Sequence, residues 1–335
     1  MVAGEPVTAD RARVALLQPF APAILDRIRV LTGPEGLALD PVPDAGPVAR
    51  RAALAQADYA VVVSVPLDAA DLDHAPHLRL VHKWGAGIDN LPLDALRARG
   101  IPVLRTAAIN APYVAELTLA LILAVLRNVA AADRSMREGR WSGSDHWLSS
   151  RSLHGRTVGL VGFGATAMAT ARLLAPFGCP ILYTARSRRD AAVERDLGAR
   201  HASLPDLLAS SDVVSLHVPL TPETRGLIGA AALASMRPTA ILVNLARGEV
   251  VDEAALIEAL RAGRIAGAGL DVFAKEPLAA DHPIARFPSV VLTPHIGGKV
   301  EENLTATVRH VMGNLRRHAA GEPLPAVDVV IGVRT

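Results

Sequence analysis

The sequence predicts an α/β protein with two domains, each built around a mainly parallel sheet. Short runs of β-branched and aliphatic residues alternate with stretches rich in alanine, leucine and arginine from one end of the chain to the other. This alternation is typical of βαβ units. Near-continuous apolar runs such as residues 158–161 suit strands that are covered on both faces. A length of 335 residues also favours two domains over one.

The strand-like runs form two separate series. The first is expected at residues 14–17, 59–63, 80–83 and 102–104, and the second at residues 157–161, 181–184, 213–216, 240–244, 268–271 and 290–293. Between the series, residues 133–154 are rich in arginine, serine, tryptophan and glycine and predict a connecting arm. Residues 301–319 predict one long helix, and the pattern leaves open which domain it joins.

The composition excludes several classes of protein. The formal net charge is +2 and no basic patch is interleaved with aromatic residues, so a nucleic-acid partner is not expected. Cys179 is the only cysteine, which rules out an internal disulfide and fits a reducing compartment. The N-terminal residues lack the apolar region of a signal peptide, and the longest apolar run, residues 117–126, is too short to cross a bilayer. We therefore expect a cytoplasmic protein without a membrane partner.

A glycine motif follows the first strand of the second series. Gly162 permits a tight turn, and Gly164 allows the backbone to approach a pyrophosphate; Ala167 stands where the motif accepts glycine or alanine. The pyrophosphate would bind at the N-terminus of the helix that opens with Ala165 and Thr166. This pattern predicts a dinucleotide site. The alternative is an ordinary glycine turn between a strand and a helix.

The end of the next strand predicts which dinucleotide is preferred. Ala185 occupies the position where an NAD enzyme usually carries an acidic residue for the ribose 2′-hydroxyl. Arg186, Ser187, Arg188 and Arg189 follow at once, and guanidinium groups bind phosphate in a bidentate manner. We therefore expect NADP(H) to be preferred, with NAD(H) as the alternative cofactor. Otherwise the run is a solvated loop, as charge runs usually are.

Three further segments carry candidate catalytic residues and a family resemblance. Residues 243–248 read Val-Asn-Leu-Ala-Arg-Gly, residues 270–277 read Leu-Asp-Val-Phe-Ala-Lys-Glu-Pro, and residues 293–298 read Thr-Pro-His-Ile-Gly-Gly. With the glycine motif, they closely resemble the D-isomer-specific 2-hydroxyacid dehydrogenases, which include glyoxylate/hydroxypyruvate reductases and phosphoglycerate dehydrogenases. The resemblance covers nearly the whole chain, and residues 83–90 resemble the family's substrate loop.

The resemblance implies a catalytic set. Arg247 would bind the carboxylate of a 2-oxo acid with its planar guanidinium. His295 would donate a proton to the carbonyl oxygen as a hydride arrives. Glu276 would orient the imidazole and keep its acid form populated. The backbone N–H groups of Ala86 and Gly87 would hold the carboxylate from the other domain, and no metal site is expected.

Each of these residues also has a structural alternative. His295 could be a structural histidine, Arg247 a surface charge, and Glu276 half of a loop ion pair with Lys275. The resemblance implies further contacts, which are predictions of the same kind. The residues expected near the adenosine are His217, Val218 and Pro219, and those expected near the nicotinamide are Ala246, Asp271 and Gly297. From their position at a strand end of the first domain, Val63, Ser64 and Val65 are expected beside the substrate side chain.

The family's architecture implies two Rossmann-like domains, with a flavodoxin-like substrate domain and the active site in the cleft. The substrate domain would take residues 1–107 and 299–335, and the dinucleotide-binding domain residues 108–298. A dimerisation arm is expected at residues 133–151, so the chain is expected to form a homodimer. Trp141 or Trp147 on this arm would reach the partner's substrate pocket, unless both only pack at the dimer interface.

These features favour an NADP(H)-dependent reductase of a small 2-oxo acid, glyoxylate or hydroxypyruvate. One alternative is an NAD-dependent D-2-hydroxyacid or phosphoglycerate dehydrogenase. Another is a dinucleotide-sensing binding protein on the same fold, similar to the corepressors that retain this catalytic set.

Overall fold

The computed structural model describes residues 12–33, 37–141 and 143–332. Residues 1–11, where no signal peptide is expected, lie outside these ranges. The chain divides into two compact units. Unit 1 comprises the described residues up to Ile109 together with those from Val300 onward, and unit 2 is Asn110–Lys299.

Unit 1 contains a mainly parallel sheet. Its described strands are β1 (Ala12–Leu16), β2 (Leu37–Pro41), β3 (Tyr59–Val62), β4 (Leu80–Lys83), β5 (Val103–Arg105) and β13 (Val329–Ile331). They lie in the order β13-β5-β4-β3-β1-β2, and only β13 is antiparallel to its neighbour. Without β13 this is the flavodoxin-like strand order, as expected.

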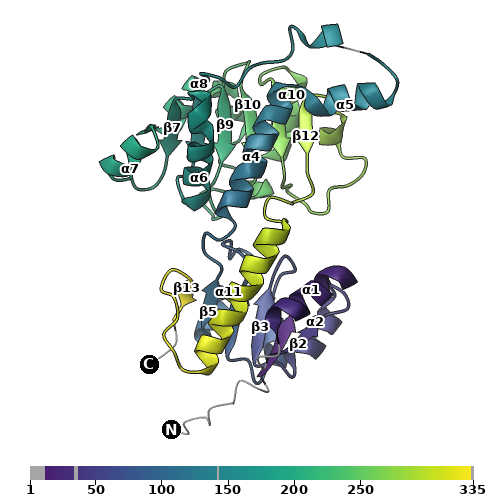
Figure 1. Ribbon diagram of the computed structural model, residues 1–335, viewed down its shortest axis with the longest axis vertical. Helices are drawn as coiled ribbons and strands as arrows, with labels where there is room; N and C mark the ends of the chain where they lie inside the picture. Colours follow the sequence, from purple (N-terminus) through teal and green to yellow (C-terminus); the bar gives the residue numbers. More distant parts are fainter. Residues whose placement is uncertain (1–11, 34–36, 142, 333–335) are drawn as a thin grey trace. The chain divides into compact units, whose positions relative to one another are not determined.

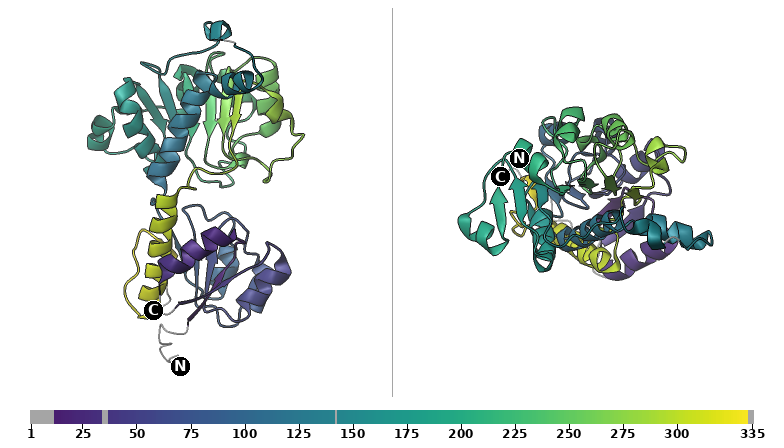
Figure 2. Two further views of the ribbon diagram at one scale, coloured as in Figure 1. Left: turned by 45° about the vertical axis from the view of Figure 1, so that its right-hand side comes forward. Right: turned by 90° about the horizontal axis from the view of Figure 1, so that it is seen from above.

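Helices cover both faces of this sheet. They are α1 (Pro22–Thr32), α2 (Pro47–Leu54), η2 (Ala69–His74), α3 (Leu93–Ala98) and α11 (Glu301–Ala319). The final helix α11 packs beside α1, as Figure 2 shows. It buries Val308 and Leu315 against the strands, and Asn314 donates to the buried His82 of β4 at 3.1 Å. These contacts answer what the sequence pattern left open: the last helix belongs to unit 1.

Unit 2 contains a parallel sheet in the Rossmann order. Its strands are β6 (Val158–Val161), β7 (Ile181–Thr184), β8 (Ala199–His201), β9 (Val213–Leu216), β10 (Ile241–Asn244), β11 (Gly267–Leu270) and β12 (Val290–Leu292). They lie in the order β12-β11-β10-β9-β6-β7-β8, and all ladders are parallel. The strand order reverses at β6, where open α/β sheets bind their ligands.

Two helical layers enclose the sheet of unit 2. The helices are α4 (Ala111–Leu126), α5 (Val129–Arg137), α6 (Ala165–Leu174), α7 (Ala191–Asp196), α8 (Leu204–Ser210), α9 (Ala230–Ser235) and α10 (Glu253–Arg261). In Figure 1, α4 and α6 lie side by side across one face. Asp252 caps α10, since its carboxylate accepts the N–H of Ala255 at 3.0 Å.

The segment after α4 is more helical than the arm predicted from sequence. Helix α5 begins at Val129 and ends at Arg137, and a short 3-10 helix, η3 (Gly143–His146), follows. Figure 1 shows this segment reaching away from the sheet of unit 2. Within the described ranges, no single helix is long and apolar enough to span a membrane; α4 and α5 reach such a length and hydrophobicity only together, as a pair bent by 65°.

Candidate active site

Most residues predicted to act in catalysis or cofactor binding gather at the carboxyl ends of the parallel strands in unit 2. Parallel strands end at the same edge, so the loops that follow them are neighbours. The glycine turn follows β6, Arg186 follows β7, His217 follows β9, Arg247 follows β10, Glu276 follows β11 and His295 follows β12. The residues predicted to hold the substrate carboxylate through their N–H groups, Ala86 and Gly87, lie in unit 1, in the loop after β4.

The glycine turn after β6 has the geometry of a phosphate site. Gly162 has φ +91°, and a methyl group there would lie 2.6 Å from the carbonyl oxygen of His217. Around Gly164 a methyl group would meet no protein atom within 4 Å, so the space beside it is open. Gly164 also precedes α6 without a side-chain cap, which leaves the first N–H groups of that helix, from Ala165 and Thr166, available to an anion.

The loop after β7 carries no acidic residue at its start, and its arginines have different surroundings. Arg188 forms a bidentate ion pair with Glu194, through Nε at 2.9 Å and Nη2 at 2.8 Å. Arg189 donates to the carbonyl oxygen of Phe163. Arg186 and Ser187 are exposed at the tip of the loop. All four residues from Arg186 to Arg189 are exposed, but the guanidinium of Arg188 is bonded to Glu194 and that of Arg189 to a backbone carbonyl oxygen.

His217 at the end of β9 is a neutral group at pH 7. Burial lowers the pKa of its imidazole to about 4. Its Nε2 lies 2.9 Å from the hydroxyl of Ser215. The next residue, Val218, packs on the apolar cluster beneath the sheet, whereas Pro219 is exposed. This loop therefore places apolar and uncharged groups next to the glycine turn.

The turn that carries Arg247 is closed by Asn244, which the sequence analysis did not single out. Asn244 is buried at the end of β10, where its amide nitrogen donates to the carbonyl of Arg247 at 2.9 Å and its amide oxygen accepts the N–H of Ala246 at 3.0 Å. The Nη1 of Arg247 donates to the carbonyl of Ala246 at 2.7 Å. The backbone under the guanidinium is thereby fixed.

Gly248 brings the Arg247 turn against the loop that contains Glu276. A methyl group at Gly248 would overlap the carbonyl group of Phe273 and the nitrogen of Ala274. The N–H of Phe273 in turn donates to Oε1 of Glu276 at 3.1 Å. Absence of a side chain at residue 248 therefore sets how close Arg247 and Glu276 can be.

Glu276 and His295 form a hydrogen-bonded pair. Nδ1 of His295 lies 2.7 Å from Oε2 of Glu276, and both side chains are roughly half exposed. Burial by itself raises the pKa of the Glu276 carboxyl. Hydrogen bonds from His295 and Phe273, and the nearby charges of His295 and Arg247, lower this pKa by a larger amount, so the net shift is downward. The ionised carboxylate accepts a hydrogen bond from Nδ1–H of His295, which leaves Nε2 to face a reactant.

Asp271 holds the turn on which His295 lies. Its buried carboxylate accepts the Thr293 hydroxyl at 2.6 Å and the N–H groups of Ile296 and Gly297 at 2.8 Å. His295 has φ +52°, a conformation that non-glycine residues rarely adopt without such support. Among the hydrogen bonds described, Oδ1 of Asp271 accepts two and Oδ2 accepts one, from Gly297. Oδ2 therefore has acceptor capacity left for a nicotinamide, as predicted for Asp271.

Two residues of unit 1 that the sequence analysis did not assign hold the predicted substrate wall. The buried ammonium group of Lys83 donates to the carbonyl of Val63, and Asn90 Nδ2 donates to the same oxygen at 3.2 Å. The N–H of Ser64 donates to Gln18 at 3.2 Å. The strand end expected beside the substrate side chain is thus fixed by polar contacts. In the sequence, the only sign of these contacts is a lysine placed directly before a glycine-rich loop.

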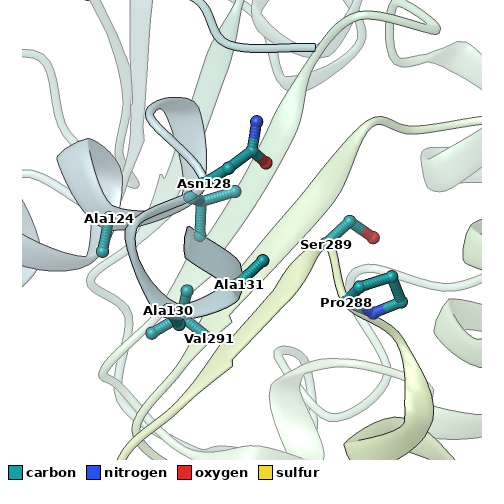
Figure 3. Close-up of a pocket in the computed structure, with 8 residues that line it drawn as sticks. Ala124, Asn128, Ala130, Ala131, Pro288, Ser289 and Val291 are labelled. Atoms are coloured by element: carbon teal, nitrogen blue, oxygen red, sulfur yellow. The ribbon is translucent and has the colours of Figure 1, made fainter. Parts of the chain in front are cut away.

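The hollow in Figure 3 lies at the opposite end of the strands in unit 2, where β12 begins. It is lined by the turn between α4 and α5, including Asn128, and by Pro288 and Ser289 before β12. Its empty space is about 160 Å³, below the roughly 300 Å³ at which ligand pockets begin. Because Pro288 precedes β12 and His295 follows it, this hollow is remote from the paired residues. Over the described residues, no cluster of three or more His, Cys, Asp or Glu side chains could hold a metal ion.

Several known proteins are similar to this chain. Residues 119–297 match the model of the D-isomer specific 2-hydroxyacid dehydrogenase NAD-binding domain. A glyoxylate reductase of Korarchaeum cryptofilum is 42% identical over 262 residues, 78% of this chain and 79% of that protein. A D-3-phosphoglycerate dehydrogenase of Mycobacterium bovis is 42% identical over 84% of this chain, but over only 53% of its own length.

Among solved structures, an NADPH-dependent glyoxylate/hydroxypyruvate reductase from Sinorhizobium meliloti, in complex with NADP and malonate, has a TM-score of 0.83. It is 32% identical, and the alignment covers 96% of this chain and 97% of that one.

The close packing at Gly248 predicts a specific sensitivity. The change Gly248→Ala should lower the free energy of unfolding by roughly 1–3 kcal/mol, because the added methyl group forces two backbone segments apart. The matched change Gly164→Ala should leave it nearly unchanged, since its methyl group meets open space. Urea unfolding followed by circular dichroism measures both. Equal stability of the two variants would contradict the proposed constraint.

Proposed function

The chain belongs to the D-isomer-specific 2-hydroxyacid dehydrogenase family, whose members act on CH–OH groups, and we propose that it reduces glyoxylate or hydroxypyruvate with NADPH. The observation that carries this proposal is the Glu276–His295 pair at 2.7 Å, with Arg247 in the adjoining loop. The glyoxylate reductase and glyoxylate/hydroxypyruvate reductase relatives at 40–42% identity support the choice of substrate.

The proposed chemistry divides between the cofactor and three side chains. The bound dihydronicotinamide supplies a hydride to the carbonyl carbon. His295 delivers the proton from Nε2 to the carbonyl oxygen, and takes it back in the reverse direction. Glu276 holds the Nδ1 proton and stabilises the charged imidazolium before transfer. Arg247 binds the carboxylate of the 2-oxo acid through paired hydrogen bonds and orients its carbonyl toward His295.

The residues present fit a dinucleotide at the edge of the sheet in unit 2. The open space at Gly164 and the uncapped start of α6 suit a pyrophosphate. Ala185 offers no carboxylate to repel a 2′-phosphate, and Arg186 is exposed directly after it. The NADP-bound relative from Sinorhizobium meliloti supports the same preference. We therefore propose NADPH over NADH, with Arg186 and Ser187 at the 2′-phosphate.

The second candidate is an NAD-dependent phosphoglycerate dehydrogenase. The Mycobacterium relative at 42% identity favours it, although this chain spans about half of that protein. The loop from Ala185 to Arg189 argues against NAD as the preferred dinucleotide. Assays with phosphohydroxypyruvate beside hydroxypyruvate, each with both cofactors, separate the two candidates. The relatives are named as enzymes, which argues against a purely dinucleotide-sensing protein.

We also propose a homodimer formed through the segment after α4. Large apolar side chains are exposed along it: Val129, Met136, Trp141, Trp147 and Leu148. The two tryptophans are each 86% exposed, and clustered exposed aromatic residues mark protein interfaces. A hollow of about 420 Å³ beside Arg140 and Trp141 offers a socket for a partner's side chain. A second copy supplies the same apolar surface, as a two-fold interface requires.

Removing the proposed proton donor should abolish most of the activity. The change His295→Ala should cut turnover roughly 100- to 10,000-fold while leaving NADPH binding nearly unchanged. Stopped-flow reduction of glyoxylate and fluorescence titration of NADPH measure the two quantities. His282→Ala is the matched control, because His282 also pairs with a glutamate, Glu253, at 3.2 Å. If both variants kept full turnover, the assignment of His295 would be wrong.

Removing the exposed arginine should change the choice of cofactor. The change Arg186→Ala should lower kcat/KM for NADPH roughly 10- to 100-fold, because a charge-assisted bond to phosphate is lost. The value for NADH should change by less than about twofold, since NADH has no 2′-phosphate. Arg200→Ala removes an exposed arginine from the neighbouring strand β8 and serves as the control. An unaltered ratio between the two cofactors in Arg186→Ala would overturn the assignment.

The arm should decide the oligomeric state. Light scattering should give about twice the chain mass of 35.1 kDa for the wild type. The double change Trp141→Ser with Trp147→Ser should shift the protein toward the monomer, because it removes the most exposed aromatic area. Val30→Ser and Val48→Ser, which alter exposed apolar residues of unit 1, are controls. A wild-type monomer at micromolar concentration would refute the dimer. An altered substrate profile in the tryptophan variant would support a role for the arm in the partner's pocket.

A further inference from the structure

The loop after β7 is tied to the glycine turn by one buried tyrosine. Tyr183 lies at 0% exposure on β7, and its ring stacks on Phe163 with centroids 4.0 Å apart and planes 19° apart. Phe163 stands between Gly162 and Gly164, so this stack joins the two loops on either side of the predicted dinucleotide. The Tyr183 hydroxyl accepts the N–H of Arg189 at 2.8 Å and donates to Glu194 at 2.7 Å.

Glu194 is the centre of the remaining contacts. It lies on α7, and its side chain is only 10% exposed. Oε1 accepts the Tyr183 hydroxyl and Nε of Arg188, while Oε2 accepts Nη2 of Arg188 at 2.8 Å. Arg188 and then Tyr183 lower the pKa of the Glu194 carboxyl to about 2, so it is ionised at any working pH. Moving Arg188 away would leave this carboxylate with one hydrogen bond in a mostly buried place, which is unfavourable.

Arg189 completes a closed set of contacts. Its Nε and Nη2 donate to the carbonyl oxygen of Phe163 at 3.0 and 2.7 Å. Two of the three arginines in the loop are therefore held by the protein itself. Arg186 lies near the loop after β9: the pKa of Glu223 there is lowered first by the hydroxyl of Thr221, and also by the charge of Arg186. Arg188 and Arg189 are exposed too, but their guanidinium groups are already bonded to Glu194 and to the Phe163 carbonyl, so a 2′-phosphate would meet Arg186 and Ser187.

We propose that Glu194 is a positioning residue for cofactor selectivity. By holding the Arg188 guanidinium and, through Tyr183, the backbone of Arg189, it fixes the loop in the shape that presents Arg186 and Ser187 to a 2′-phosphate. Arg188, although it belongs to the arginine run, does not bind the phosphate. This inference rests on the proposed preference for NADP(H), and it adds a residue, Glu194, that lies nine positions beyond Ala185.

The test uses ligands that carry the 2′-phosphate without the nicotinamide. Calorimetry gives the dissociation constants of 2′,5′-ADP and 5′-AMP for the full-length protein, independently of turnover. The change Glu194→Gln should weaken 2′,5′-ADP roughly tenfold, because the loop loses its ionic anchor, and 5′-AMP by less than twofold. Arg188→Ala should have the same effect as Glu194→Gln. The double variant should be no worse than either single one, because both remove the same pair.

Three further variants make the experiment decisive. Arg186→Ala should weaken 2′,5′-ADP more than Glu194→Gln does, and its effect combined with Arg188→Ala should be less than additive, because the Glu194–Arg188 pair acts in part through Arg186. Tyr183→Phe keeps the stack on Phe163 but removes the hydroxyl, so it should reproduce the loss in selectivity. It replaces Glu194→Gln in the test if that variant folds poorly. Arg200→Ala controls for the loss of a positive charge on the neighbouring strand. Thermal unfolding of every variant reports whether a change in binding reflects a damaged fold.

The outcomes separate this inference from the proposed function. Wild-type protein that binds 5′-AMP as tightly as 2′,5′-ADP would refute the NADP(H) preference itself. A wild-type preference for 2′,5′-ADP that survives both Glu194→Gln and Arg188→Ala would refute the positioning role alone. Tighter binding of 2′,5′-ADP by Glu194→Gln, together with a loss in Arg188→Ala as large as that in Arg186→Ala, would place Arg188 on the phosphate and overturn the inference.

Discussion

The contact between Gly248 and the backbone of Phe273 and Ala274 is the constraint on which the reactive edge of unit 2 depends. Two loops from neighbouring strands meet there without any side chain between them. Arg247 immediately precedes this contact on one loop. On the other loop, Glu276 follows it after a short turn, and the Glu276 carboxylate accepts the N–H of Phe273. Because backbone atoms are less mobile than side chains, the contact fixes the separation of the two charged groups more firmly than a salt bridge could.

Buried or half-buried carboxylates then organise the loops that the sheet itself does not hold. Asp271 gathers the turn of His295, Glu276 fixes the imidazole, and Glu194 collects the loop after β7. Each accepts several N–H or O–H donors, and bonds to an ionised acceptor are shorter and stronger than neutral ones. A site built this way is arranged before a ligand arrives, so little binding energy is lost in ordering it.

Local patterns predicted most of the fold because they depend on near neighbours in the chain. The central strands β4, β7 and β9 and the long helix α11 lie where their apolar patterns placed them. The strands that were missed, β2, β8 and β13, all lie at sheet edges. An edge strand buries fewer side chains: β8 and β13 have only three residues each, and each of the three strands has at most one buried residue, so they carry little hydrophobic signal. Their pairing depends on the rest of the sheet.

The sequence by itself determined which chemical groups are present: a glycine turn after a strand, an arginine, a glutamate and a histidine at the ends of later strands, and an arginine run without a preceding acid. Only the tertiary structure decided how the arginines of that run are used. Arg188 is paired with Glu194, and Arg189 binds the carbonyl of Phe163, which lies 26 residues earlier. The physical reason is that a guanidinium binds the acceptor nearest in space, and the packing of separate strands and helices sets that distance.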